Sequence, residues 1–204
     1  KLAGQTIIYG LSSILARFFN YLLVPLHTSV FTTDQFGIIT EMYAYVAFLF
    51  VLLTYGMETA YFRFSTNEDI DKEKVYSTTF LTVLSTSIIF ILFGTFFSVP
   101  ISKWLRYPDN SEFVIWFAII VSLDALTSIP LAKLRSENKA KKFALINIMS
   151  VLMNIFLNLF FFLYCLPHYK NGDINWIVES FYNPQIGVGY VFISNLISSI
   201  FKLL

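Results

Sequence analysis

Charged side chains are scarce in this sequence. Only 13% of its 204 residues are Asp, Glu, Lys or Arg, whereas a soluble domain carries about 25%. Hydrophobic residues make up 56%, and the aromatic residues include 23 Phe and 12 Tyr. So few charges cannot cover a soluble domain that also hides so many aromatic rings, which excludes an ordinary water-soluble fold. The net charge of +1 leaves no basic surface for a nucleic acid, so we expect no nucleic-acid partner.

Cysteine and histidine are also rare. The single cysteine, Cys165, cannot form an internal disulfide and is too little for a metal-binding or redox motif. The two histidines, His27 and His168, lie far apart in the chain and form no ligand pattern. We therefore expect no metal site, no cofactor and no enzymatic activity.

What the sequence does contain is six long apolar runs separated by polar segments. Each run has about 19–26 residues, enough at ~1.5 Å per residue to cross a hydrocarbon core of ~30 Å. Inside lipid a helix satisfies its own backbone hydrogen bonds, so these runs should be helical. We predict an all-α, polytopic membrane bundle of about six transmembrane helices over residues 1–204. The predicted helices are 7–30, 37–62, 75–99, 113–134, 143–166 and 186–204.

The distribution of Lys and Arg in the connections predicts the orientation, because basic residues collect on the cytoplasmic side. With the N-terminus inside, nine basic residues are cytoplasmic and three are external. The nine are Lys1, Arg63, Lys72, Lys74, Lys133, Arg135, Lys139, Lys141 and Lys142, and the three are Lys103, Arg106 and Lys170. The count favours a cytoplasmic N-terminus.

Polar residues recur with helical spacing along the first predicted helix. Around Arg17, near the middle of that helix, we expect one polar face, opposite an apolar, lipid-like face. The residues assigned to the polar face are Thr6, Gly10, Ser12, Ser13, Asn20, Tyr21 and Thr28. A charge at that depth costs ~2.5–3.5 kcal/mol on insertion scales and needs a partner or water. Either Arg17 forms an ion pair with Glu58 or Asp124, or it is an anion site in a hydrated cavity.

The fifth predicted helix carries amides in place of a charge. Asn147, Asn154 and Asn158 are seven and four residues apart and share one face with Ser150. They could bond neighbouring helices or form a wall that faces a sugar. On the fourth helix Asp124 is deep enough to need a partner or a function. Polar faces on several helices favour a bundle around a hydrophilic cleft.

Several short motifs resemble those of bacterial polysaccharide-biosynthesis flippases. They are Gly4-Gln5-Thr6, Tyr9-Gly10, the 20–26 run NYLLVPL, Phe36-Gly37, the 55–64 segment YGMETAYFRF and the 187–192 segment GVGYVF. The resemblance covers nearly the whole chain. These flippases form the oligosaccharide branch of the superfamily that also contains the multidrug and toxic-compound extruders.

The resemblance implies a two-lobed, MATE-like transporter with six helices per lobe around a central cavity. This chain would be the N-terminal lobe, and we expect a C-terminal lobe as its missing partner. The substrate implied is a polyprenyl-diphosphate-linked oligosaccharide, moved across the bacterial inner membrane for polysaccharide or lipopolysaccharide (O-antigen) synthesis while its tail stays in membrane lipid. In the related flippases an arginine on the first helix engages the diphosphate, and Arg17 is the residue that matches it. We expect the sugar to contact Ser13, Asn20, Tyr21, Asn147, Asn154 and Asn158, with Asp124 and Glu58 as coupling or ion-pair residues.

Two other functions fit parts of the sequence. A multidrug or cation antiporter of the same fold would place acidic residues in its cavity, and Asp124 and Glu58 agree with that reading. The positive charge of Arg17 favours an anionic substrate instead. A membrane glycan polymerase or ligase would need catalytic residues on a large outer loop. The longest such loop, 167–185, offers His168, Lys170, Asp173 and Glu179 without recognisable spacing.

The charge count predicts the topology. A reporter fused after Lys141 should read as cytoplasmic, and one fused between Asn171 and Asn175 should read as external. Paired fusions, one reporter active only inside and the other only outside, measure this directly. The opposite pattern would reverse the orientation and the direction of export.

Overall fold

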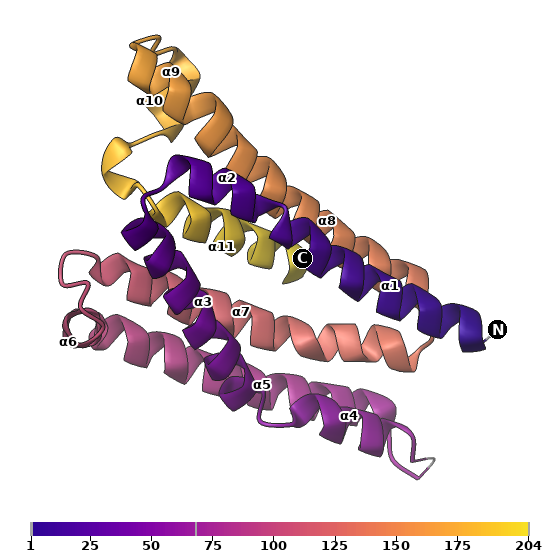
Figure 1. The fold of residues 1–204 in the computed structure, drawn as a ribbon. Coiled ribbons are helices and arrows are strands. Elements are labelled where there is room, and N and C mark those ends of the chain that lie inside the picture. The colour runs from indigo at the N-terminus through magenta and orange to yellow at the C-terminus, as the bar shows by residue number, and fades with distance from the viewer. Residues whose placement is uncertain (1, 68, 204) are drawn as a thin grey trace.

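A computed structural model describes residues 2–67 and 69–203, with side chains from Tyr9 onward, and this part of the chain is helical with no strand (Figure 1). The prediction of an all-α membrane bundle is confirmed. The helices are α1 (Leu2–Tyr21), α2 (Leu23–Val30), α3 (Thr33–Thr54), α4 (Met57–Ser65), α5 (Lys72–Phe96), α6 (Ser98–Trp104), α7 (Ser111–Ser136), α8 (Ala140–Leu159), a π-helical stretch (Phe160–Cys165), α9 (Leu166–Asn171), α10 (Trp176–Phe181), a 3₁₀ turn (Pro184–Ile186) and α11 (Gly189–Leu203).

Each of the six predicted runs coincides with helical structure. Four segments in the described part of the chain are long and apolar enough to cross a bilayer: Thr33–Ser65, Lys72–Phe96, Ser111–Ser136 and Ala140–Asn171. The first run consists of α1 and α2. The last coincides with α11, an apolar helix of 15 described residues.

The first predicted helix is divided at Leu22 into α1 and α2. Three others are interrupted where the sequence pattern gave no warning. The second run breaks between α3 and α4, where Tyr55 (φ 32°) and Gly56 (φ 78°) both have left-handed backbones. Gly56 adopts this conformation without steric cost. The third run breaks at Phe97, between α5 and α6. The fifth widens into the π-helical stretch that ends at Cys165. Hydropathy detects apolar length, and it is insensitive to these local backbone changes.

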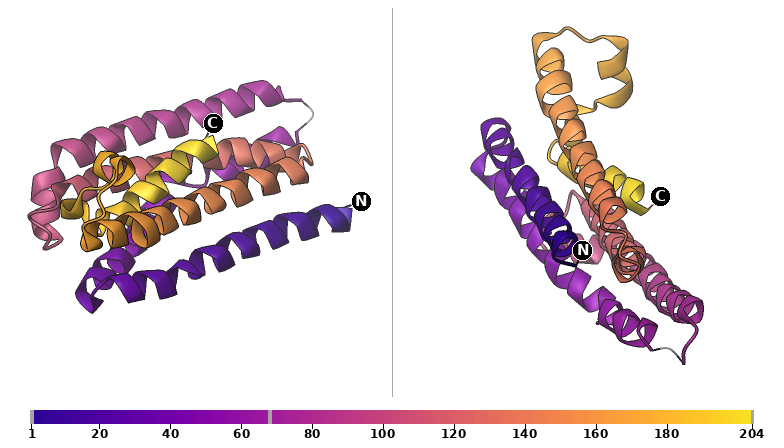
Figure 2. Two further views of the ribbon diagram at one scale, coloured as in Figure 1. Left: turned by 90° about the horizontal axis from the view of Figure 1, so that it is seen from above. Right: turned by 90° about the vertical axis from the view of Figure 1, so that its right-hand side faces the viewer.

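Helix α7 is the centre of the bundle. In its most apolar stretch 67% of residues are buried, against 17–28% in the three other spans. Its aromatic end packs Phe113 and Phe117 against Phe192 of α11, with ring centroids 5.0 and 4.6 Å apart. Further along, Val121 and Ala125 pack with Val83 of α5. Figure 2 shows α1 and α3 along one side of the bundle and α8, α7 and α5 along the other.

Large apolar side chains cover the outside of the long helices. On α5 the exposed side chains include Leu81, Ile89, Phe93 and Phe96, and on α8 they include Leu145, Leu152 and Phe156. In water such a surface would be a strong aggregation site. In a bilayer it is the surface that contacts lipid chains, as the shortage of charge predicts.

A close approach of α5 and α7 depends on a glycine. A Cβ atom on Gly94 would lie 2.7 Å from the Cβ of Ala118. Gly94→Ala should therefore force the two helices apart and lower the free energy of unfolding by about 1–3 kcal/mol. Thermal unfolding of the purified protein in detergent measures the effect. The matched control is Gly37→Ala on α3, where nothing lies within 4 Å of the added atom and stability should be unchanged or slightly higher. Equal effects of both changes would contradict the packing argument.

Candidate functional site

The first helix presents Arg17 on an open face. Ser13, Arg17, Asn20 and Tyr21 are all exposed, as the predicted stripe requires. Ser12 is different: it is 3% exposed and was wrongly assigned to this stripe. Five residues separate it from Arg17, and at ~100° per residue that places the two side chains on nearly opposite sides of the helix. Helix α1 packs on α8 through the side that carries Ser12.

Arg17 makes no ion pair with any described residue. Both expected partners are engaged elsewhere. Glu58 pairs with Arg135 of α7, and Asp124 accepts a hydrogen bond from the Ser199 hydroxyl at 2.9 Å. The guanidinium of Arg17 is therefore left available on the open face of α1, near the middle of the α1–α2 segment.

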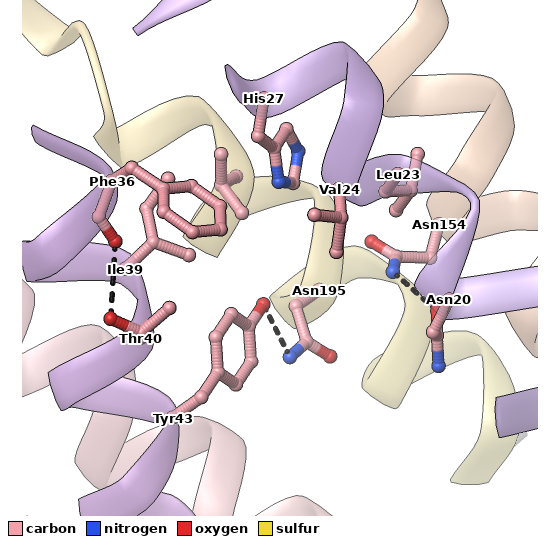
Figure 3. Close-up of a pocket in the computed structure, with 11 residues that line it drawn as sticks. Asn20, Leu23, Val24, His27, Phe36, Ile39, Thr40, Tyr43, Asn154 and Asn195 are labelled. Carbon is pink, nitrogen blue, oxygen red and sulfur yellow. Dashed lines mark hydrogen bonds between the residues drawn. The ribbon is translucent and has the colours of Figure 1, made fainter. Parts of the chain in front are cut away.

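A pocket of about 390 Å³ lies between α1, α2 and α3 on one side and α8 and α11 on the other (Figure 3). Its walls combine apolar side chains with neutral polar ones. The lining residues are Asn20, Leu23, Val24, His27, Phe36, Ile39, Thr40, Tyr43, Asn154, Val191 and Asn195. Neither a carboxylate nor a lysine or arginine is among them. This pocket can offer several hydrogen bonds without a net charge.

A chain of hydrogen bonds connects the polar groups on one side of this pocket. His27 Nε2 donates to Asn158 Oδ1 at 2.8 Å, because that oxygen can only accept. The Asn158 amide donates to Asn154 Oδ1 at 3.1 Å, and the Asn154 amide donates to Asn20 Oδ1 at 3.3 Å. The amide nitrogen of Asn20 ends the chain. It has no partner in the described part of the protein and is left to donate to a ligand (Figure 3).

The three predicted amides of α8 thus have different environments. Asn154 lines the pocket, whereas Asn158 is fully buried behind it and links His27 to Asn154. Asn147 is half-buried and lines none of the pockets described for this chain. Ser150, on the same face, bonds Ser198 of α11, with 2.8 Å between the hydroxyl oxygens. Helix-to-helix bonding therefore accounts for Asn158 and Ser150.

A second, charged pocket of about 560 Å³ lies further along the same cleft. Two acidic and two basic side chains line it: Glu58, Asp124, Arg135 and Lys202. The Arg135 guanidinium lies 5.3 and 5.5 Å from the ring centroids of Phe62 and Phe143. Rings at these distances favour a cation. Arg135 Nε is buried without a hydrogen-bond partner among the described residues.

Tyr43 of α3 joins the two pockets, because its side chain lines both. Its hydroxyl accepts a hydrogen bond from the Asn195 amide of α11 at 3.0 Å. The sequence pattern did not predict Tyr43, Asn195 or His27 as site residues. The helical spacing of Ser194, Asn195, Ser198 and Ser199 could have revealed the polar face of α11, whereas His27 has no sequence signal of its own. Among the described residues no group of His, Cys, Asp and Glu side chains is arranged to hold a metal ion.

A comparison with known protein families identifies the family of this chain. A family model described as polysaccharide biosynthesis protein matches residues 30–169, more than half of the chain. The chain belongs to this family. No curated protein and no solved structure matches it.

The matched region of this polysaccharide biosynthesis protein runs from α3 into α9 and contains Tyr43, Glu58, Asp124, Arg135, Asn154 and Asn158. Arg17, Asn20 and Asn195 lie outside it. The family match therefore supports a membrane protein with a role in polysaccharide biosynthesis, and the walls that α1 and α11 contribute are argued from this chain alone.

The His27–Asn158 hydrogen bond should make a measurable contribution to stability. In a double-mutant cycle with His27→Leu and Asn158→Leu, we expect a coupling energy of about 0.6 kcal/mol and at most ~1.7 kcal/mol, the range found for hydrogen bonds between membrane helices. Unfolding of the four variants in detergent measures it. The control cycle pairs His27→Leu with Asn147→Leu. Because Asn147 lies about three helical turns from Asn158, that coupling should be near zero. Equal coupling in both cycles would contradict a direct bond.

Proposed function

We propose that this polysaccharide biosynthesis protein is a flippase that moves a polyprenyl-diphosphate-linked oligosaccharide across the bacterial inner membrane, with its N-terminus in the cytoplasm. The observation that carries the proposal is Arg17, a cation on the open face of α1 that no described carboxylate neutralises. Water or an anion must compensate a guanidinium at mid-membrane depth. The diphosphate of a lipid carrier is such an anion, and a guanidinium binds it through two parallel hydrogen bonds.

The neutral pocket supports the proposal that the substrate carries an oligosaccharide. A glycan presents many hydroxyl groups that both donate and accept hydrogen bonds. Asn20, Thr40, Tyr43 and Asn195 provide neutral donors and acceptors, while Ile39, Val24 and Val191 provide apolar walls. Asn20 can take part in binding both the diphosphate and the sugar, because it follows Arg17 by about one helical turn and also lines the pocket. In this proposal the diphosphate binds at Arg17 and the first sugars extend toward the pocket, with a C-terminal lobe closing the cavity.

The balance of charge in the second pocket favours this proposal over a cation antiporter. A site for cationic drugs would carry unpaired carboxylates. Glu58 is paired with Arg135, and Asp124 shares its pocket with Lys202. Two acidic and two basic groups leave the pocket without excess negative charge. We therefore propose that the Glu58–Arg135 pair and Asp124 act in closing the cleft or in the energy coupling of transport. We also propose that the protein is a transporter rather than an enzyme.

Replacement of Arg17 tests the proposal. Arg17→Ala in the whole protein should leave membrane abundance unchanged, since removal of a mid-membrane charge eases insertion, but glycan export should fall by at least tenfold. Arg17→Lys keeps the charge without the planar fork and should retain partial export. Export is measured as surface glycan in cells that lack their own flippase. Full export by Arg17→Ala at normal abundance would refute the assignment.

Arg135 provides the matched control, because it has the carboxylate partner that Arg17 lacks. Arg135→Ala strands Glu58 at a half-buried position and should lower protein abundance. Glu58→Gln in the same chain should restore it. If Arg17→Ala also lowered abundance and were rescued by Glu58→Gln or Asp124→Asn, Arg17 would be a structural ion-pair residue. Unchanged export with altered polymer length would point to a glycan polymerase.

A further inference from the structure

A third polar pocket, whose lining does not include Arg17, lies between the middle of α3 and the end of α6 with the segment that follows it. It has a volume of about 510 Å³ and is lined by Glu41, Tyr45, Trp104, Leu105, Arg106 and Tyr107. None of these residues lines either pocket of the cleft described above. Figure 1 shows α3 crossing α7 and α5 obliquely, with α6 at the left end of the bundle. The charge count places this end of the bundle outside the cell.

Glu41 is held in a fixed position by two phenols. Tyr45 donates to one of its carboxylate oxygens at 3.0 Å, and Tyr107 donates to the other. Burial, together with the Glu41 carboxylate, raises the pKa of Tyr107 to about 12, so this phenol stays protonated and remains a donor. Each carboxylate oxygen keeps a second acceptor position. Glu41 is exposed and forms no ion pair among the described residues.

Arg106 provides a positive charge in the same pocket. Its backbone has φ 68°, in the left-handed region, and its side chain is exposed without an ion-pair partner in the described part of the chain. A positive and a negative group thus line one pocket, and each lacks a protein counter-ion. A ligand that matches them carries an anion and a cation of its own.

An apolar groove continues directly from this pocket. It has a volume of about 370 Å³ and shares Tyr45, Trp104 and Leu105 with the polar pocket. Its floor is buried and includes Met42, Gly94, Phe117 and Ala118, and its rims are the exposed rings of Phe48, Phe93 and Trp104. The glycine and alanine give the groove its depth. It has the shape and chemistry for a hydrocarbon chain.

We propose that the pocket and groove together bind one molecule of a zwitterionic glycerophospholipid with a primary ammonium headgroup, such as phosphatidylethanolamine. The ammonium donates to Glu41, the phosphate pairs with Arg106, and one acyl chain lies in the groove between α3, α5, α6 and α7. Charge complementarity selects this occupant. An anionic phospholipid would satisfy Arg106 but meet the Glu41 carboxylate, and a diphosphate would be repelled more strongly. This site is independent of the proposed flipping of a glycan carrier.

The experiment compares lipids retained by the purified whole protein, with native mass spectrometry of protein–lipid complexes as the readout. Phosphatidylethanolamine, phosphatidylcholine and phosphatidylglycerol of identical chains are the probes. Phosphatidylcholine is the sharpest comparison, because its quaternary ammonium has the same charge but no N–H to donate. Hydrogen bonds to charged groups support about a tenfold preference for phosphatidylethanolamine. Glu41→Gln should remove that preference, whereas Glu179→Gln, the loss of an equal charge in α10, should preserve it.

Two further variants test the phosphate contact and the acyl-chain groove. Arg106→Asn, which suits a left-handed backbone, should weaken all three lipids, because each carries the phosphate. Phe93→Ala removes a rim of the groove and should weaken all three lipids, whereas Phe96→Ala, exposed on the same helix outside the groove, should have little effect. Unfolding temperatures near that of the unmodified protein verify that the variants are folded. Equal retention of the three lipids, unaffected by Glu41→Gln, would overturn the proposal. Displacement of phosphatidylethanolamine by a polyprenyl diphosphate would also overturn it and give the site to the glycan carrier.

Discussion

Every polar group placed inside a bilayer must find a partner within the protein or face a hydrated space, and the arrangement of these helices follows from that constraint. Lipid chains are as apolar as leucine, so the hydrophobic effect does not bring membrane helices together. Polar contacts between side chains perform that role here. Asn158 bonds His27 across α8 and α2, Ser150 bonds Ser198 across α8 and α11, and Asn195 bonds Tyr43 across α11 and α3. Each contact joins helices that are distant in sequence.

The same constraint separates the cleft into two chemically different parts. Near α2 the polar groups are neutral amides, a histidine and hydroxyls, and they satisfy one another in a chain. Near α4 they are charged: Arg135 forms an ion pair with Glu58 and lies close to two aromatic rings. Tyr43 stands at the boundary. Opposite charges that neutralise each other can line a cleft without attracting bulk ions, while the neutral part keeps free donors such as the Asn20 amide.

Apolar length and helical periodicity predicted the positions of the helices well, because both properties belong to single segments. The long run 113–134 corresponds to α7, Ser111–Ser136. Periodicity also placed Ser13, Arg17, Asn20 and Tyr21 on one face, although it misassigned Ser12. What could not be predicted depends on pairs of segments. The partner of Glu58 is Arg135, 77 residues away, and nothing in either helix specifies the other. The burial of Asn158 and the role of His27 likewise arise only when α2 packs on α8.

The exposed surface of α1 limits what can lie next to it. One part of that surface is apolar and includes Leu11, Ile14 and Phe18, while the adjoining part carries Ser13, Arg17 and Asn20. The apolar part can contact lipid chains, but the part around Arg17 cannot do so without the cost of an unpaired charge. Helix α1 must therefore stand at the edge between lipid and a hydrated or protein-lined space. Asn20 links that edge to the cleft, because it belongs both to this face of α1 and to the lining of the neutral pocket.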